Sequence, residues 1–450
     1  MGYRIKSGEI VKARSRNVVR VLGFALVAVL LTGCVMLGDR LDQFRWHFGT
    51  LPFFVFDNAP GYKPLPEPRV MDKPVNIAIA ISGGGTRSAV FAAGCMEQLA
   101  YLPRPDSRSV LERAQVVSGV SAGSMAATYY ALYKPAKFSS LEEKESFFRQ
   151  FKSHMTVDFW MRGWAHYLSH PWEGVLKYYT RYRFAQTLAN TFDEHLYLGQ
   201  TFRDLSRREI TGEAPVTLVN GTVLDTGDRF VFTTLHVGKN FTVNPATFGN
   251  DPFLGILAHA FSTPAYRAIG FDSIDSDISS FRIASAVAAS CAFPVLPGPL
   301  TIRDYASRGY VHIADGGVSD NSGVDSIVQL FLSRAKGDNS RLVVIALDAS
   351  APLVPGRAKD PNGYVGSAKY AEHAATIQGR RSQTLSFLML NASPRIRVVH
   401  LPLWESPQAQ YLDPMPQLYI SEMDWYRILC AAEEVTKSHK EEILRAVFGE

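Results

Sequence analysis

The sequence has little cysteine, with four residues in a chain of 450. No CxxC, HExxH or EF-hand pattern is present, which excludes the common zinc-binding, metallopeptidase and calcium-binding classes. The cysteines also lie far apart in the sequence, so no disulfide framework is expected. We therefore predict free or buried thiols, no structural metal and no cofactor.

Net charge is nearly absent outside the N-terminus. The chain has 47 basic and 42 acidic side chains, and residues 1–33 hold six of the basic and one of the acidic ones. The rest of the chain balances at 41 of each sign, so it lacks the basic excess of a nucleic-acid-binding protein. We expect no nucleic-acid partner, and nothing in the sequence indicates an obligatory protein partner.

The N-terminus lacks an apolar run long enough to cross a membrane. Residues 21–32 (VLGFALVAVLLT) are uncharged, whereas a transmembrane helix needs about 20 apolar residues. A basic stretch before such a short run predicts a secretory signal. The run ends in LTGC at Cys34, which resembles the lipobox of bacterial lipoproteins; a buried cysteine that ends a short hydrophobic helix is the alternative.

The lipobox resemblance implies that the chain is cleaved before Cys34 and that this cysteine is acylated, with palmitate among the acyl chains. Several acyl chains would hold the protein firmly on a membrane. Val35 follows the cysteine in place of Asp, which favours the outer membrane as its place in the bacterial cell envelope.

Short apolar runs and helical patterns alternate from residue 75 onward. We predict strands at residues 75–82, 115–118, 216–224, 230–235, 310–314, 342–347 and 396–401. We predict helices at residues 88–102, 124–133, 283–290, 325–333, 368–390 and 419–448. Strands that alternate with helices predict an α/β sandwich with a mostly parallel central sheet.

The pattern G-x-S-x-G occurs at Gly119-Val120-Ser121-Ala122-Gly123, between a predicted strand and a predicted helix. This is the context of a nucleophile elbow, a turn so sharp that the neighbours of the serine must be small. Such a turn presents the serine hydroxyl at the start of a helix, whose dipole favours a nearby anion. Ser121 is therefore a candidate nucleophile.

The sequence SGGGTR begins at Ser82, after a predicted strand and before a predicted helix. Three consecutive glycines let backbone N–H groups approach an anion closely. The spacing is not G-x-G-x-x-G and no P-loop lysine follows, which disfavours nucleotide binding. An oxyanion hole uses the same geometry, and a tight turn that binds nothing is the alternative.

A third turn, Asp315-Gly316-Gly317, follows the predicted strand at residues 310–314. A carboxylate at the end of a strand lies where α/β proteins keep their sites, and it could orient a group or accept a proton. An Asx turn without a functional role is the alternative.

The order GGGxR, GxSxG and DGG resembles that of the patatin-like phospholipases. The stretch ASCAFPVLP at residues 289–297 is similar to a segment that this family carries between its nucleophile and its Asp. The resemblance covers about residues 75–350. It implies a lipid acyl hydrolase with a Ser–Asp dyad on a three-layer α/β/α sandwich.

Matched residue by residue, the resemblance assigns Ser121 as the nucleophile and Asp315 as the base that accepts its proton. It assigns the oxyanion hole to the amides of Gly83, Gly84, Gly85, Thr86 and Arg87. The glycines of the elbow and of the DGG motif are Gly119, Gly123, Gly316 and Gly317. Ser82 and Ser88 depart from the family pattern, which more often has Asp and a small residue there, and both flank the expected hole.

The chain is expected to consist of four parts. These are a signal peptide (1–33), a lipid anchor with a proline-rich tether (34–74), a patatin-like catalytic domain (75–350) with an aromatic-rich insertion at about 135–212, and a C-terminal helical and strand extension packed on that domain (351–450). Residues 151–200 hold twelve of the 52 aromatic residues. Trp160, Trp164 and Trp172 among them suit an apolar groove or a membrane interface, or simply the core.

Two sets of alternatives remain open from the sequence. A Ser121–Asp315–His400 triad would fit an α/β-hydrolase, but His400 lies in a strand-like run and His312 alternates within its own strand. The leading function is a membrane-anchored lipid acyl hydrolase of phospholipase A or lysophospholipase type, with membrane lipids as its surroundings and substrate. The alternatives are a general carboxylesterase for small or neutral-lipid esters and a non-catalytic lipid-binding lipoprotein.

The Cys34→Ala variant is expected to remain uncleaved at this site and to carry no acyl chain, because the thiol is the acceptor. Metabolic labelling with palmitate measures this, and equal labelling of variant and wild type would contradict the lipobox interpretation. Since the rest of the chain is electrically balanced, the wild-type protein is also expected to stay on membranes at high salt.

Overall fold

The computed structural model describes residues 57–102, 108–170, 184–249, 251–293, 298–335, 339–350, 367–412 and 419–449. A nine-stranded sheet forms its centre, with the order β11-β10-β2-β3-β4-β5-β6; β9 pairs with β4 and β8. Its strands are β2 (Val75–Ile81), β3 (Val116–Val120), β4 (Val216–Val223), β5 (Arg229–Phe232), β6 (Ala268–Ile269), β8 (Leu300–Arg303), β9 (Tyr310–Asp315), β10 (Arg341–Asp348) and β11 (Ile396–Pro402). Strands β1 (Ala59–Pro60) and β7 (Ser276–Asp277) form a separate pair.

The strands from β11 to β4 are parallel to one another, whereas β5 and β9 run antiparallel to β4. Each of the seven strands predicted from the sequence is present, with ends that differ by a few residues. The expectation of an α/β fold with a mostly parallel central sheet is confirmed. Strand β8 is absent from the prediction because its four residues, LTIR, are too short to show a clear alternation.

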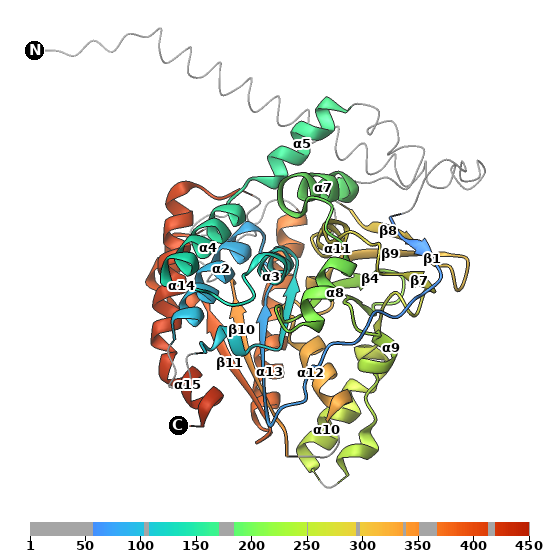
Figure 1. Ribbon diagram of the computed structural model, residues 1–450, viewed down its shortest axis with the longest axis vertical. Coiled ribbons are helices and arrows are strands. Elements are labelled where there is room, and N and C mark those ends of the chain that lie inside the picture. The colour runs from blue at the N-terminus through green and yellow to red at the C-terminus, as the bar shows by residue number, and fades with distance from the viewer. Residues whose placement is uncertain are drawn as a thin grey trace, which may run out of the picture. The chain divides into compact units, whose positions relative to one another are not determined.

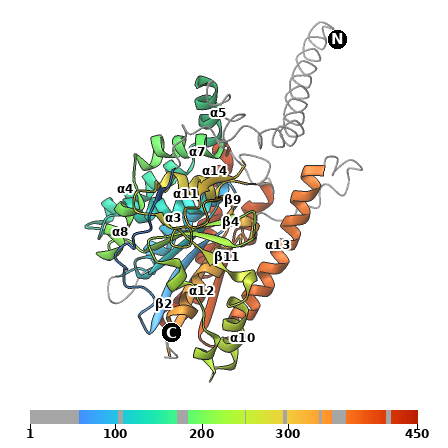
Figure 2. The ribbon, with the colours of Figure 1, turned by 90° about the vertical axis from the view of Figure 1, so that its right-hand side faces the viewer.

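Helices cover both faces of this sheet (Figure 2). They are α2 (Thr86–Tyr101), α3 (Ala122–Tyr133), α4 (Leu141–Met155), α5 (Phe159–Ser169), α7 (Phe184–Phe192), α8 (Phe202–Ile210), α9 (Val237–Asn240), α10 (Pro252–Phe261), α11 (Ile283–Ser290), α12 (Val324–Arg334), α13 (Ser367–Asn391), α14 (Glu422–Ser438) and α15 (Lys440–Phe448). Alternate residues of β2 show the two layers. Ile79 packs in the core with α2 and α3, whereas Ala80 faces the core of α10, α12 and α13.

The residues beyond 350 contribute to the central sheet itself. Strand β11 pairs in parallel with β10 along its whole length, and α14 lies beside α2 (Figure 1). At Gly94 the two helices come so close that a Cβ atom there would lie 2.8 Å from the Cβ of Ala432. The C-terminal part therefore completes one edge of the sheet and one of its helical layers.

Part of the aromatic-rich segment packs as core. The rings of Trp164 in α5 and Phe184 in α7 lie 5.0 Å apart, and Trp164 is partly buried against the main apolar core. This favours the core interpretation for Trp164. Trp172 and the side chain of Trp160 lie outside the described residues.

The expectations for the signal peptide and for Cys34 also lie outside the described residues. The described part of the predicted tether, residues 57–74, packs on the body: Ala59 pairs with Asp277 of β7, and Val70 and Met71 are buried. Among the helices that the structure does describe, none has the length and apolar character needed to cross a membrane.

Glu209 of α8 carries a buried carboxyl group that ties this helix to the sheet. It accepts hydrogen bonds from the backbone N–H of Thr217 in β4, at 2.8 Å, and from the hydroxyl of Thr234. Burial raises the pKa of Glu209 to about 8, because it penalises the charged form more than these two hydrogen bonds favour it.

The raised pKa of Glu209 makes stability depend on pH. The folded chain holds a proton that the unfolded chain releases, so stability is expected to fall as the pH rises from about 4.5 to about 8. Glu209→Gln keeps the shape but does not titrate. We therefore expect its melting temperature to change less than that of the wild type across this window, as calorimetry would measure. Equal changes in both proteins would contradict the assignment.

Candidate active site

The three predicted motifs meet at the carboxyl edge of the central sheet. The glycine loop follows β2, the elbow follows β3, and Asp315 ends β9. Strands β2 and β3 are parallel neighbours, with Ile81 opposite Gly119, and β9 joins them through β4. Motifs that are far apart in the sequence thus share one site.

Ser121 has the strained backbone of a nucleophile elbow, with φ 52° and ψ −134°. Gly119 and Gly123 permit the turn. A Cβ atom on Gly119 would collide with the backbone of Ser124, and one on Gly123 would lie 2.5 Å from the carbonyl oxygen of Ser82. Gly119 therefore lets the turn close on itself, and Gly123 lets it pack against the end of β2.

Asp315 lies against Ser121, the predicted nucleophile, and is 3% exposed. Burial raises its pKa to about 6, while hydrogen bonds from the Gly317 amide and the Ser121 hydroxyl lower it. The Gly317 amide donates to Oδ1 of Asp315 at 2.8 Å, and Gly316 packs on the carbonyl of Asn220. The carboxylate is therefore ionised near neutral pH and basic enough to accept the serine proton.

The glycine loop lies beside Ser121, and two of its residues need the conformational freedom of glycine. A Cβ atom on Gly83 would lie 3.3 Å from the Cβ of Ser121, and Gly84 and Gly85 have φ values of +151° and +65°. The N–H of Gly83 donates to the carbonyl oxygen of Asn321 at 3.0 Å. This corrects the expectation that the Gly83 amide faces the oxyanion; the later amides, from Gly84 to Arg87, stay predicted donors.

Ser82, Ser88 and Arg87 brace the loop from behind. The hydroxyl of Ser88 donates to the carbonyl of Ser82, and the hydroxyl of Ser82 accepts from the amide of Ala349 at 3.0 Å. The Arg87 side chain is 2% exposed, and its Nε donates to the Ala349 carbonyl at 2.8 Å. The two departures from the family pattern thus occupy structural positions.

The structure separates the candidate histidines from the dyad. Nε2 of His400 lies 3.0 Å from Oδ2 of Asp348, and Nδ1 of His312 lies 3.1 Å from Oδ2 of Asp225. Strand β11, which carries His400, is three places from β3 in the sheet, or about 14 Å at the usual strand spacing. Among the described residues, no histidine is hydrogen-bonded to Ser121 or Asp315, which favours the dyad over the triad.

Three residues near the dyad are not among the site residues predicted from the sequence. Asn321 places its Oδ1 between Gly83 and Gly317, where a Cβ atom on either glycine would meet it. Cys291 has a thiol that contacts the Ser121 hydroxyl, and the Ser290 hydroxyl accepts from the Ser121 amide. Ser290 and Cys291 lie in the ASCAFPVLP stretch, whose similarity to the family segment was the sequence signal that could have identified them.

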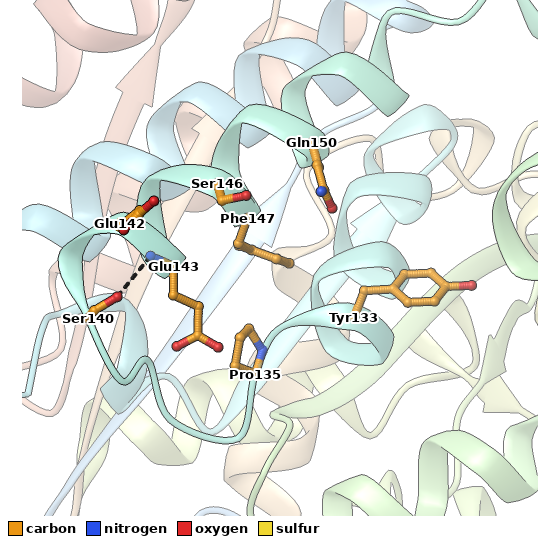
Figure 3. Close-up of a pocket in the computed structure, with 8 residues that line it drawn as sticks. All are labelled: Tyr133, Pro135, Ser140, Glu142, Glu143, Ser146, Phe147 and Gln150. Carbon is orange, nitrogen blue, oxygen red and sulfur yellow. Dashed lines mark hydrogen bonds between the residues drawn. The ribbon is translucent and has the colours of Figure 1, made fainter.

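A hollow of about 480 Å³ lies away from this site (Figure 3). It is lined by Tyr133, Pro135, Ser140, Glu142, Glu143, Ser146, Phe147 and Gln150. Tyr133 ends α3, whereas Ser121 precedes its first residue. Twelve helical residues separate the two ends by about 18 Å, so none of the predicted site residues belongs to this hollow.

We expect Ser121→Ala and Asp315→Asn each to abolish ester hydrolysis, because one removes the nucleophile and the other its base. The double variant should be little worse than either single variant, since the pair acts as a unit. His400→Ala is the matched control and should retain most activity. A loss at His400 as deep as that at Ser121 would overturn the dyad.

Comparison with known proteins agrees with this site. The patatin-like phospholipase family matches residues 79–328, and no curated protein matches the chain. Human GIVD cytosolic phospholipase A2 is 13% identical with a TM-score of 0.47 over 83% of this chain and 60% of that one. The complex of the same protein with methyl gamma-linolenyl fluorophosphonate and terbium chloride is 15% identical, with a TM-score of 0.45, over 85% of this chain and 60% of that one. VipD from Legionella pneumophila is 12% identical, with a TM-score of 0.31, over 89% of this chain and 73% of that one.

The chain spans about 60% of the length of the human structures that it matches, and at these TM-scores the structural matches carry no argument about activity. The family match covers more than half of the chain. It includes the glycine loop, the elbow and the DGG turn, which the structure brings together. The chain therefore belongs to the patatin-like phospholipase family.

Proposed function

We propose that the protein is a serine lipid acyl hydrolase of phospholipase A or lysophospholipase type, held on a membrane through Cys34. The observation that carries this proposal is the contact of the Ser121 hydroxyl with the buried Asp315 carboxylate, beside a glycine loop at the start of a helix. The family supports a lipid ester as the substrate.

In the proposed reaction, Oγ of Ser121 attacks the ester carbonyl carbon while Asp315 accepts the serine proton. The amides of the glycine loop and of the first turn of α2 stabilise the negative oxygen of the tetrahedral intermediate. The intermediate releases the alcohol, which takes the proton back, and leaves an acyl group on Ser121. Water then attacks this ester with Asp315 as the base, which releases the fatty acid and restores the serine.

Two exposed apolar side chains lie close in sequence to residues of the proposed dyad. Phe293 follows the turn that contacts Ser121 and is 48% exposed, and Val318 lies three residues after Asp315 and is 52% exposed. Exposed apolar side chains at a site favour a ligand with a large apolar surface. This supports acyl chains over small polar esters.

Asp57 ties the N-terminal part of the described chain to helix α11. The side chain of Asp57 accepts a hydrogen bond from Ser285 of α11 at 3.0 Å. Arg282, which precedes the same helix, lies 3.6 Å from Asp57. Helix α11 ends at Ser290, beside Ser121, so Asp57 is attached to the helix that leads into the proposed active site.

The pH dependence of the reaction tests the role of Asp315. Since only the ionised carboxylate accepts a proton, kcat/KM should rise with pH through a midpoint near 6, the pKa of Asp315. A pH–rate profile on a neutral ester measures this. A midpoint at the pKa of an ordinary exposed Asp, about 4, would contradict the assignment.

The substrate class is tested with a fluorophosphonate probe and a panel of esters. The wild type should be labelled at Ser121, and Ser121→Ala should not be, which separates an enzyme from a lipid-binding protein. Long-chain phospholipids or lysophospholipids should be cleaved with higher kcat/KM than short-chain esters. The reverse preference would favour the general carboxylesterase.

A further inference from the structure

The turn at the end of α11 contacts both members of the dyad. It consists of Ser290, Cys291 and Ala292, all in the stretch between nucleophile and base. We propose that this turn sets the position of Ser121 relative to Asp315, and that Ser290 is a positioning residue for the reaction. This inference rests on the proposed function.

Ser290 holds the nucleophile from the side of its backbone. The amide of Ser121 donates to Oγ of Ser290 at 2.8 Å, and this hydroxyl donates to the carbonyl of Asn220 at 2.6 Å. Ser290 is fully buried, so no water replaces either bond. The amide of Ser121 is consequently engaged within the protein and is not a donor to the oxyanion.

The other end of the same turn holds the base. The amide of Asp315 donates to the carbonyl of Ala292 at 2.9 Å. The carbonyl of Asp315 accepts from the hydroxyl of Thr222 at 2.9 Å, which fixes the opposite side of the residue. Ser290 and Ala292 are only two residues apart, so one short turn accepts hydrogen bonds from the backbone of the nucleophile and from the backbone of its base.

Asn220 of β4 anchors the turn to the sheet. Its Nδ2 donates to the carbonyl of Gly119 at 3.0 Å, so it holds the elbow directly as well as through Ser290. Its Oδ1 accepts from the hydroxyl of Ser326 at 2.6 Å. Asn220, Ser290 and Ser326 are all buried, and buried polar groups that are all paired specify one geometry.

The nucleophile needs such support because its backbone is strained. A non-glycine residue at positive φ persists only where its surroundings determine it. The hydrogen bond from the Ser121 N–H to Oγ of Ser290 opposes relaxation of the elbow. Relaxation would move Oγ of Ser121 away from the Asp315 carboxylate. The hydrogen bond from Ser121 lowers the pKa of Asp315, so its loss would raise that pKa.

Among the described residues, the groups that change the pKa of Asp315 besides burial are the Gly317 amide and the Ser121 hydroxyl. The neighbouring titratable group is the Cys291 thiol, whose pKa the charge of Asp315 raises. Burial and the charge of Asp315 raise the pKa of Cys291 above its ordinary value, so the thiol remains neutral throughout the range in which Asp315 titrates.

The experiment compares Ser290→Ala with Ser285→Ala. Both serines are fully buried in α11, but the Ser285 hydroxyl donates to Asp57 and not toward the nucleophile. We expect Ser290→Ala to lower the rate constant of fluorophosphonate labelling and kcat by about 10- to 100-fold, as orphaning a buried donor predicts, with little change in KM. The midpoint of its pH–rate profile should move above that of the wild type. Ser285→Ala should leave the labelling rate constant, kcat and the pH midpoint unchanged.

A third variant, Ser290→Cys, keeps a weak acceptor and should fall between the wild type and Ser290→Ala. All rates are measured below the lowest melting temperature in the series. Labelling and pH midpoints in Ser290→Ala that equal those of the wild type would overturn the inference, as would an equal loss in Ser285→Ala. A wild-type protein that the probe does not label would instead overturn the proposed function.

Discussion

The first turn of α3 lies directly on the end of β2, and the rest of the active site depends on this approach. Gly123 has no side chain to separate the two: a Cβ atom there would lie 2.8 Å from Cγ2 of Ile81 as well as against Ser82. Because the gap is so small, the elbow and the glycine loop form one continuous surface. Ser121 and the N-terminus of α2, the predicted oxyanion site, are thus held close together by this packing.

Two buried aspartates at the carboxyl edge of the sheet show how partners decide their chemistry. Asp315 has an amide and a neutral hydroxyl as partners, so burial dominates and its pKa rises. Asp348 is as deeply buried, but hydrogen bonds from His400 and Ser350 and the charge of His400 outweigh the burial and lower its pKa. Only Asp315 is therefore poised to exchange a proton near neutral pH, whereas Asp348 remains a fixed anion that holds β10 and β11 together.

The sequence was sufficient for the features that local sterics decide. The elbow, the glycine loop and the DGG turn each occupy consecutive residues whose type follows from the shape of the turn, and the strand–helix alternation predicted the sheet. Their partners were not predictable in this way. Asn220 and Asn321 act through pairings across the fold, and the Gly83 amide was misassigned because its acceptor, the Asn321 carbonyl, lies in a distant segment.

The position of β2 in the sheet also bears on when the active site comes into being. This strand leads into the glycine loop, yet one of its two neighbours is β10, where Leu342 lies opposite Asn76. Closing so long a stretch of chain is slow, and during synthesis the partner does not exist until most of the polypeptide has been made. A ribosome-bound chain thus carries the complete elbow long before β2 is enclosed on both sides. The side of the candidate active site that β2 forms is consequently among the last parts of the sheet to be completed during synthesis.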